Sequence, residues 1–132
     1  MIKTIVVEVT RRVKHAVYGR GVAHLVLPAA SVVLVGPAHR ASFDGIALHA
    51  RGAWETPLGS VPIDEELADA LLAADPMLFD DPAPHACEHS LEMQLPFLQR
   101  VLPELRIVPL LMGSQSRDEV DALARALATA AA

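Results

Sequence analysis

Two short and almost uninterrupted apolar segments constrain the fold of this chain more than any other feature of its sequence. Residues 31–35 read Ser-Val-Val-Leu-Val, and residues 106–112 read Arg-Ile-Val-Pro-Leu-Leu-Met. Strands that are buried on both faces have this pattern, whereas strands with one wet face alternate apolar and polar residues. Both segments are therefore predicted to be strands inside a parallel sheet. Pro109 predicts an edge or a bulge in the second strand, because proline lacks the N–H group that a ladder requires.

Further strands and helices are predicted around these segments. Two more strands are expected, over residues 3–9 and 45–50, with extended pieces and turn residues over 54–62. Amphipathic patterns predict three helices, over residues 64–74, 88–102 and 116–131. Asp64 and Ser116 are expected to cap the first and third helices, and Pro96 to kink the second. Strands that alternate with helices predict a three-layer α/β fold, a mainly parallel sheet with flanking helices. Residues 10–30 receive no assignment.

The composition excludes several classes of partner. The chain has 132 residues, enough for one domain with a core. Its net charge of −5 does not favour binding to nucleic acid or to an anionic membrane. No apolar run reaches the roughly 18 residues that span a bilayer. Cys87 is the only cysteine. An internal disulfide is therefore impossible, and a reducing compartment, the cytoplasm, is expected.

A histidine follows the first apolar segment directly, in the string Gly36-Pro37-Ala38-His39. Ligands of open α/β sheets gather beyond the carboxyl ends of strands, so His39 is predicted to lie at a binding edge. The glycine permits an unusual backbone angle, and the proline is expected to stiffen the exit from the strand. A neutral imidazole in this position can act as a metal ligand or a general base. The alternative is a loop histidine that only hydrogen-bonds to backbone.

Residues 85–89, His-Ala-Cys-Glu-His, match the H-x-x-E-H motif of inverted zinc proteases. On a helix, His85 and His89 would lie one turn apart, with Glu88 beside them as a base. This zinc-hydrolase hypothesis requires the two imidazoles to converge on one point. Because Pro84 places His85 at or before the helix start, the alternative is a cap and a solvated first turn.

The same predicted helix carries Glu88, His89 and Glu92, which share one side at the spacings i, i+3 and i+4. A carboxylate beside an imidazole can orient the ring and raise its basicity. These three residues are therefore the candidate catalytic residues. The alternative is an ordinary polar helix face.

Four strings taken together resemble the Memo family, whose bacterial members are often called AmmeMemoRadiSam system protein B. They are residues 31–39, residues 56–59 with Ile63-Asp64, the string Glu-His-Ser-Leu-Glu-Met-Gln-Leu-Pro-Phe at 88–97, and residues 107–113. The third string is the most specific. Order and spacing agree over residues 31–128, so residues 1–132 are predicted to form a single partial Memo-like domain.

This resemblance implies a fold related to class III extradiol dioxygenases, which hold a non-haem iron at the mouth of an α/β sheet. Some members of the Memo family are reported to bind iron or copper. The resemblance also implies that His39 is a metal-site histidine and that Glu88, His89 and Glu92 line the same cleft.

The sequence departs from the family at a second metal-site histidine, which stands in a Pro-His-Ala-Gly-Tyr motif. The nearest string here is Lys-His-Ala-Val-Tyr at residues 14–18, which keeps His15 but not the proline or the first glycine. An alternative alignment puts Val9 in that place. A later Ser-Ser-Asp-x-x-His type motif of the family would lie beyond the end of the chain. The fold is therefore expected to be incomplete at both ends, and the metal site, with His39 and His15, to be incomplete.

The sequence thus predicts a Memo-like protein of undetermined activity, and it does not decide whether the chain is an enzyme. One hypothesis is a non-haem iron or copper protein with redox or dioxygenase-like chemistry and an incomplete site. The second is a non-enzymatic binding module or remnant fragment, and a weaker third is the zinc hydrolase. An unidentified small-molecule ligand is expected, with no nucleic-acid or membrane partner. Self-association through unpaired sheet edges is also expected.

Overall fold

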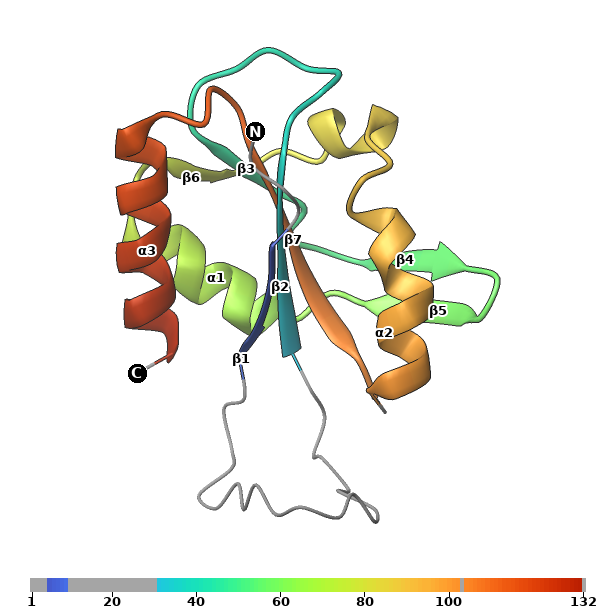
Figure 1. Cartoon of the computed structure of the whole chain (residues 1–132). Coiled ribbons are helices and arrows are strands. Elements are labelled where there is room, and N and C mark those ends of the chain that lie inside the picture. The colour runs from blue at the N-terminus through green and yellow to red at the C-terminus, as the bar shows by residue number, and fades with distance from the viewer. Residues whose placement is uncertain (1–4, 10–30, 103, 132) are drawn as a thin grey trace, which may run out of the picture.

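The computed structural model describes residues 5–9, 31–102 and 104–131 (Figure 1). His15 and the rest of the unassigned segment 10–30 lie outside the described residues. The described strands are β1 (Ile5–Val9), β2 (Ser31–Pro37), β3 (Ile46–Leu48), β4 (Ala53–Thr56), β5 (Gly59–Pro62), β6 (Leu78–Asp80) and β7 (Arg106–Met112). The described helices are α1 (Glu65–Ala74), α2 (Leu95–Val101) and α3 (Arg117–Ala131), with 3₁₀ helices η1 (Ala83–Cys87) and η2 (Glu92–Gln94).

The main sheet is mixed, so the prediction of a mainly parallel sheet is confirmed only in part. Its strand order is β1-β2-β7-β3-β6, and β4 pairs with β5 in a separate hairpin. The β2–β7 and β3–β6 pairs are parallel, whereas β1–β2 and β3–β7 are antiparallel. The loop of residues 38–45 between β2 and β3 is too short for the crossover that a parallel strand would need. The chain therefore turns back at the carboxyl end of β2 and enters β3 in the opposite direction.

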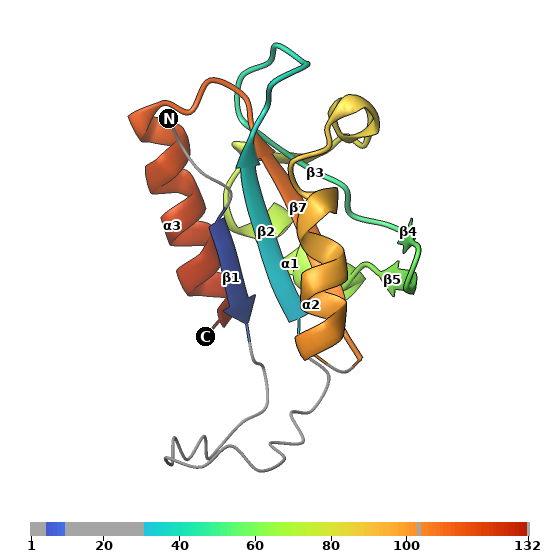
Figure 2. The same ribbon diagram turned by 45° about the vertical axis from the view of Figure 1, so that its right-hand side comes forward.

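Helices cover both faces of this sheet, which confirms a layered α/β fold (Figures 1 and 2). Val33 and Val35 of β2 belong to a buried cluster with side chains of α1 and α3. Val32 and Leu34 belong to a second cluster, with Leu91 and side chains of α2 and the β5 end. None of these four strand residues is more than 1% exposed. The continuous apolar run therefore did indicate a strand buried on both faces.

Pro109 lies in the middle of β7, which runs between β2 and β3, so the predicted edge or bulge is wrong. Its carbonyl accepts a hydrogen bond from the His49 N–H (3.2 Å), one residue past the end of β3 at Leu48. The N–H and C=O of one strand residue point to the same side. The N–H group that proline lacks would therefore point to a place where β3 has already ended. Its absence costs the sheet little backbone hydrogen bonding.

The first and third helices begin as their caps predict. The Asp64 carboxylate accepts a hydrogen bond from the Leu67 N–H at the start of α1 (2.9 Å). Ser116 and Glu119 form a reciprocal capping box at the start of α3, with both backbone N–H groups bonded at 3.2 Å. Among the residues described, none of the helices is both long and apolar enough to cross a membrane.

The second predicted helix, over 88–102, is wrong in its first half. Glu88 has an extended backbone, η2 is a single 3₁₀ turn, and α2 begins only at Leu95. Pro96 therefore lies in the first turn of α2, where a backbone N–H has no intrahelical partner, and it has no helix to kink. Leu91 is nevertheless buried in the same cluster as Leu95. The spacing of the apolar residues therefore indicated which side chains are buried, and it did not indicate a helical backbone.

Candidate functional site

His39 lies at the carboxyl edge of the sheet, where the sequence placed it. β2 ends at Pro37, and the Ala38 N–H donates to the Met112 carbonyl at the end of β7 (3.0 Å). Because β2 and β7 are parallel, their carboxyl ends meet at this edge. The His39 side chain is 51% exposed. It is therefore a surface imidazole held next to the end of a rigid strand pair.

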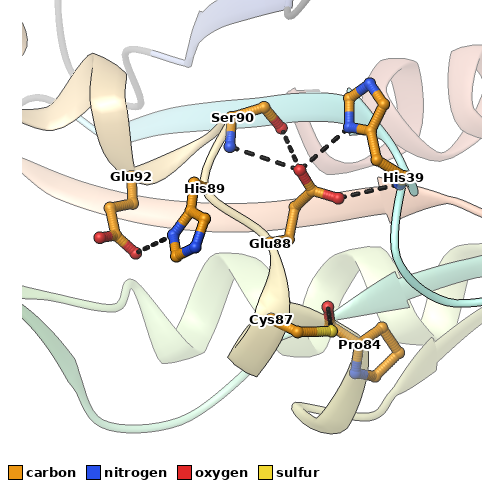
Figure 3. A network of polar contacts seen from close by, with 7 residues as sticks. All are labelled: His39, Pro84, Cys87, Glu88, His89, Ser90 and Glu92. Carbon is orange, nitrogen blue, oxygen red and sulfur yellow. Dashed lines mark hydrogen bonds and ion pairs between the residues drawn. The ribbon is translucent and has the colours of Figure 1, made fainter.

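The Glu88 carboxylate holds His39 at two points, as Figure 3 shows. Oε2 accepts a hydrogen bond from the His39 backbone N–H (2.9 Å), and Oε1 lies 3.0 Å from His39 Nδ1. The Ser90 hydroxyl (3.0 Å) and the Ser90 N–H (3.4 Å) also donate to Oε1. Glu88 is only 7% exposed. Both carboxylate oxygens are thus occupied inside the protein, and the loop and ring of His39 are fixed together.

Gly36 allows the segment that carries Glu88 to come so close to β2. A Cβ atom at this position would lie 2.9 Å from Leu91 Cδ2 and 3.5 Å from Ser90 Oγ. The backbone of Gly36 is not in the left-handed region. The glycine is therefore needed here for the space that it leaves to a neighbouring chain segment, and the unusual backbone angle that it permits is not used.

Hydrogen bonds keep Glu88 ionised in spite of its burial. Desolvation alone would raise the pKa of the carboxyl group, but the donors from His39 and Ser90 outweigh it and lower the pKa from 4.5 to about 2. At neutral pH the group is therefore a carboxylate and acts as an acceptor only.

An ionised Glu88 determines the tautomer of His39. Because the carboxylate can only accept, the proton of a neutral imidazole must lie on Nδ1. The other ring nitrogen, Nε2, then carries a lone pair, and in Figure 3 it points away from Glu88. A histidine whose second nitrogen donates to a carboxylate is the usual arrangement of a protein metal ligand, and it also suits a proton acceptor. Glu88 is thus placed to orient His39 rather than to react itself.

His89 and Glu92, the other candidate catalytic residues, do not join this pair. The His89 Nδ1 and Glu92 Oε2 atoms are 3.9 Å apart, and the side chains are 71% and 57% exposed. In Figure 3 they lie on the other side of the Glu88 backbone from His39. The predicted common helix face of Glu88, His89 and Glu92 is wrong, because Glu88 is extended and precedes the helical turns. Of the alternatives for a second metal-site residue, His15 lies outside the described residues and Val9 ends β1.

The H-x-x-E-H motif does not form the geometry that its chemistry needs. His85 is buried in η1, and its Nε2 lies 2.8 Å from the Ala47 carbonyl oxygen. His89 is exposed and paired with Glu92. Within residues 5–9, 31–102 and 104–131, no group of three or more His, Cys, Asp or Glu side chains is placed to hold a metal ion. The two histidines are held by different partners, and the zinc-hydrolase hypothesis loses its structural basis.

Sequence reasoning missed a cluster of three rings from separate segments, His49, Trp54 and His85. The Trp54 indole N–H donates to His49 Nδ1 (2.7 Å). The three ring centroids lie 5.8 to 5.9 Å from one another. This cluster lines a pocket of about 400 Å³ together with Glu55 and Glu92. The sequence signal that could have pointed to this cluster is the single tryptophan of the chain, which lies in the turn-rich segment 54–62.

Two other features lie at the two ends of β7. At its carboxyl end, Glu119 is fully buried and accepts hydrogen bonds from the N–H groups of Gly113 (3.1 Å) and Ser114 (3.1 Å), so it closes the turn that follows β7.

At the other end of β7, a second pocket of about 500 Å³ includes Leu105 and Arg106. It lies at the amino end of β7, away from the carboxyl edge that carries His39.

The fold and the site define a class: an α/β protein with a mixed sheet whose carboxyl edge presents a histidine oriented by a buried carboxylate. The family follows from comparison with known sequences. The model of the family described as Memo-like protein matches residues 6–132, and this chain belongs to that family.

Curated relatives support the assignment. The chain is 49% identical over 84 residues to a MEMO1 family protein of Methanopyrus kandleri, covering 63% of this chain and 30% of the relative. It is 41% identical over 103 residues to one of Pyrococcus abyssi (75% and 35%), and 39% identical over 95 residues to one of Methanobrevibacter smithii (72% and 34%). The chain thus spans about a third of the length of the curated relatives that it matches. No solved structure matches it significantly.

Proposed function

We propose that this Memo-like chain contributes His39, oriented by Glu88, as one ligand arm of a non-haem iron or copper site of the extradiol-dioxygenase type. The contact between Glu88 Oε1 and His39 Nδ1 carries this proposal, because it leaves Nε2 as the free donor atom. The position of His39 beyond the carboxyl end of β2 supports it, since ligands of such sheets gather there. The compartment that we propose is the cytoplasm, on the ground of the single cysteine.

The described residues do not fit a complete metal site. A non-haem iron or copper centre needs about three protein ligands in fixed positions. His39 offers one nitrogen, and both oxygens of its neighbour Glu88 are already used by His39 and Ser90. Neither His89 nor Glu92 is brought to His39. The function that we propose for the isolated chain is therefore weak metal binding through a single ligand, without dioxygenase turnover.

Metal analysis of the 132-residue protein, expressed without a polyhistidine tag, tests this proposal. The protein is loaded with Fe²⁺ under anaerobic conditions, or with Cu²⁺, then dialysed, and the retained metal is measured by mass spectrometry. We expect far less than one equivalent in the wild type and in the control His89→Ala, and less again in His39→Ala. A full equivalent that is lost in His39→Ala and kept in His89→Ala would show that the chain holds a complete site.

A non-enzymatic binding module is the second candidate function. The pocket lined by His49, Trp54 and His85 favours it, because the pocket is formed entirely by described residues and does not depend on a metal. Its volume of about 400 Å³ lies within the usual range for small-molecule sites.

A further inference from the structure

The Trp54 side chain is held by an imidazole that must be neutral. The β4–β5 hairpin stands apart from the main sheet (Figures 1 and 2), whereas His49 directly follows β3 of that sheet. The Trp54 indole N–H donates to His49 Nδ1 (2.7 Å), and an indole nitrogen can only donate. His49 must therefore keep a lone pair on Nδ1 and carry its single proton on Nε2. A second proton, on Nδ1, would place two donors face to face and break this contact.

His85, the third ring of the cluster, is restricted to its neutral form as well. Its Nε2 atom lies 2.8 Å from the Ala47 carbonyl oxygen, so this nitrogen carries the proton. The other ring nitrogen, Nδ1, is buried and has no hydrogen-bond partner among the described residues. A proton on Nδ1 would create a buried charge whose N–H has no acceptor. The ring centroid of His85 lies 5.9 Å from those of His49 and Trp54, so a charge on one imidazole also opposes a charge on the other.

The carboxylates around the two imidazoles do not compensate for this restriction. Burial lowers the pKa of both His49 and His85 from 6.5, and it outweighs the neighbouring negative charges, which raise the pKa. These neighbours are Asp80 of β6 for His49, and Asp81 and Glu88 for His85. The other charged residues that line the adjacent pocket are Glu55 and Glu92. Both rings are therefore neutral at pH 7, in the only form that their contacts allow.

We propose that the contact between His49 and Trp54 is an acid-sensitive latch, in which protonation of His49 releases the indole from both imidazoles. The proton comes from the solvent and is bound by Nδ1, the atom that accepts the indole N–H in the latched state. The rest of the hairpin stays attached, because Val61 of β5 is buried and Gln99 of α2 bonds to the hairpin at two points. The latch therefore moves one side chain and does not unfold the protein. It is separate from the pair of His39 and Glu88 and does not rest on the proposed metal function.

The latch closes at neutral pH and opens in acid. The released state has an exposed imidazole with a pKa near 6.5, and the latched state has a lower pKa. The latched state is therefore fully favoured above pH 6.5 and loses this advantage as the pH falls toward its own pKa. Over that interval the ratio of released to latched molecules rises up to about tenfold per pH unit for His49 alone. It rises up to about a hundredfold per unit where His85 takes up a proton in the same step.

The indole N–H of Trp54 reports on the latch directly, because the chain has only one tryptophan and therefore one indole signal in a nitrogen–proton correlation spectrum. The 132-residue protein is titrated from about pH 8 to about pH 5. We expect the indole signal to move from the position of a hydrogen-bonded N–H toward that of an indole in water, with a midpoint below pH 6.5 and an unchanged far-ultraviolet circular dichroism spectrum. An indole signal that stays fixed over the whole range would overturn the proposal. So would a simultaneous loss of secondary structure, because it would mean global acid unfolding.

The variant His49→Asn then tests whether this imidazole is the group that responds to acid. An asparagine oxygen can accept the indole N–H but is not protonated in this range. In wild type, we expect acid to shift the tryptophan emission maximum to longer wavelength and to make the indole accessible to acrylamide. In His49→Asn, we expect the midpoint of both changes to fall by at least about one pH unit. The control is His89→Asn, which removes a 71% exposed imidazole and should behave as wild type. An unchanged midpoint in His49→Asn, or an equal shift of the midpoint in the control, would contradict the proposal.

Discussion

Replacement of Glu88 by glutamine gives the sharpest test of how the site is held. Oε2 accepts from the His39 N–H, while Oε1 faces His39 Nδ1 and accepts from Ser90. A glutamine side chain has one oxygen and one NH₂ group, so it cannot accept on both sides. Either the backbone N–H of His39 or the cluster around its ring loses an acceptor. A buried group left unpaired in this way costs about 1–3 kcal/mol.

The pKa of Glu88 gives a second measure of the same contribution and its pH dependence. The depression from 4.5 to about 2 corresponds to on the order of 3 kcal/mol. Water screens the half-exposed His39 ring, so we expect about 1–2 kcal/mol of this in the folding free energy. Because the pKa is lowered in the folded state, this stability is fully present above pH 4.5 and is lost as the pH falls toward about 2.

Urea denaturation of wild type and Glu88→Gln at several pH values between about 7 and about 2.5 measures this difference. We expect the variant to be less stable by about 1–2 kcal/mol at neutral pH, and the two curves to converge at the acid end. Glu92→Gln is the control, because Glu92 is 57% exposed and its pair with His89 is long at 3.9 Å. The control should change by less than about 0.5 kcal/mol. If Glu88→Gln keeps the stability of wild type at neutral pH, the carboxylate does not hold the site.

Two further predictions concern packing and association. In Gly113→Ala, the new Cβ would lie 2.0 Å from the Phe43 carbonyl oxygen, so we expect a loss of about 3 kcal/mol or more in chemical denaturation. Gly36→Ala, which meets only the flexible end of a side chain, should cost less, and equal costs would contradict this reasoning. Phe97 is 73% exposed on α2, so Phe97→Glu is expected to reduce self-association in sedimentation velocity, whereas Val120→Glu on α3 should not. Equal association in all three proteins would exclude the α2 surface.

Local signals in the sequence predicted those elements whose formation depends on neighbours along the chain. The apolar run before Gly36 predicted a strand buried on both faces, and the strand β2 confirms it. Asp64 and the Ser116–Glu119 pair predicted where α1 and α3 begin, because a cap bonds to N–H groups only two or three residues away. The same signal failed over residues 88–94. There, the spacing of buried leucines imitates a helix although the backbone is mostly a loop with one 3₁₀ turn.

The sequence by itself determined which segments are buried, which helices are capped and that His39 follows the end of a strand. Only the tertiary structure decided that Pro109 is tolerated in a central strand, because the neighbouring strand ends where the missing donor would face. It also decided that Glu88 orients His39, 49 residues away in the chain, and that His49, Trp54 and His85 share one pocket. Periodicity records the burial of each residue within its own segment. It carries no information about which distant segment supplies the partner, and this candidate site is made of such pairs.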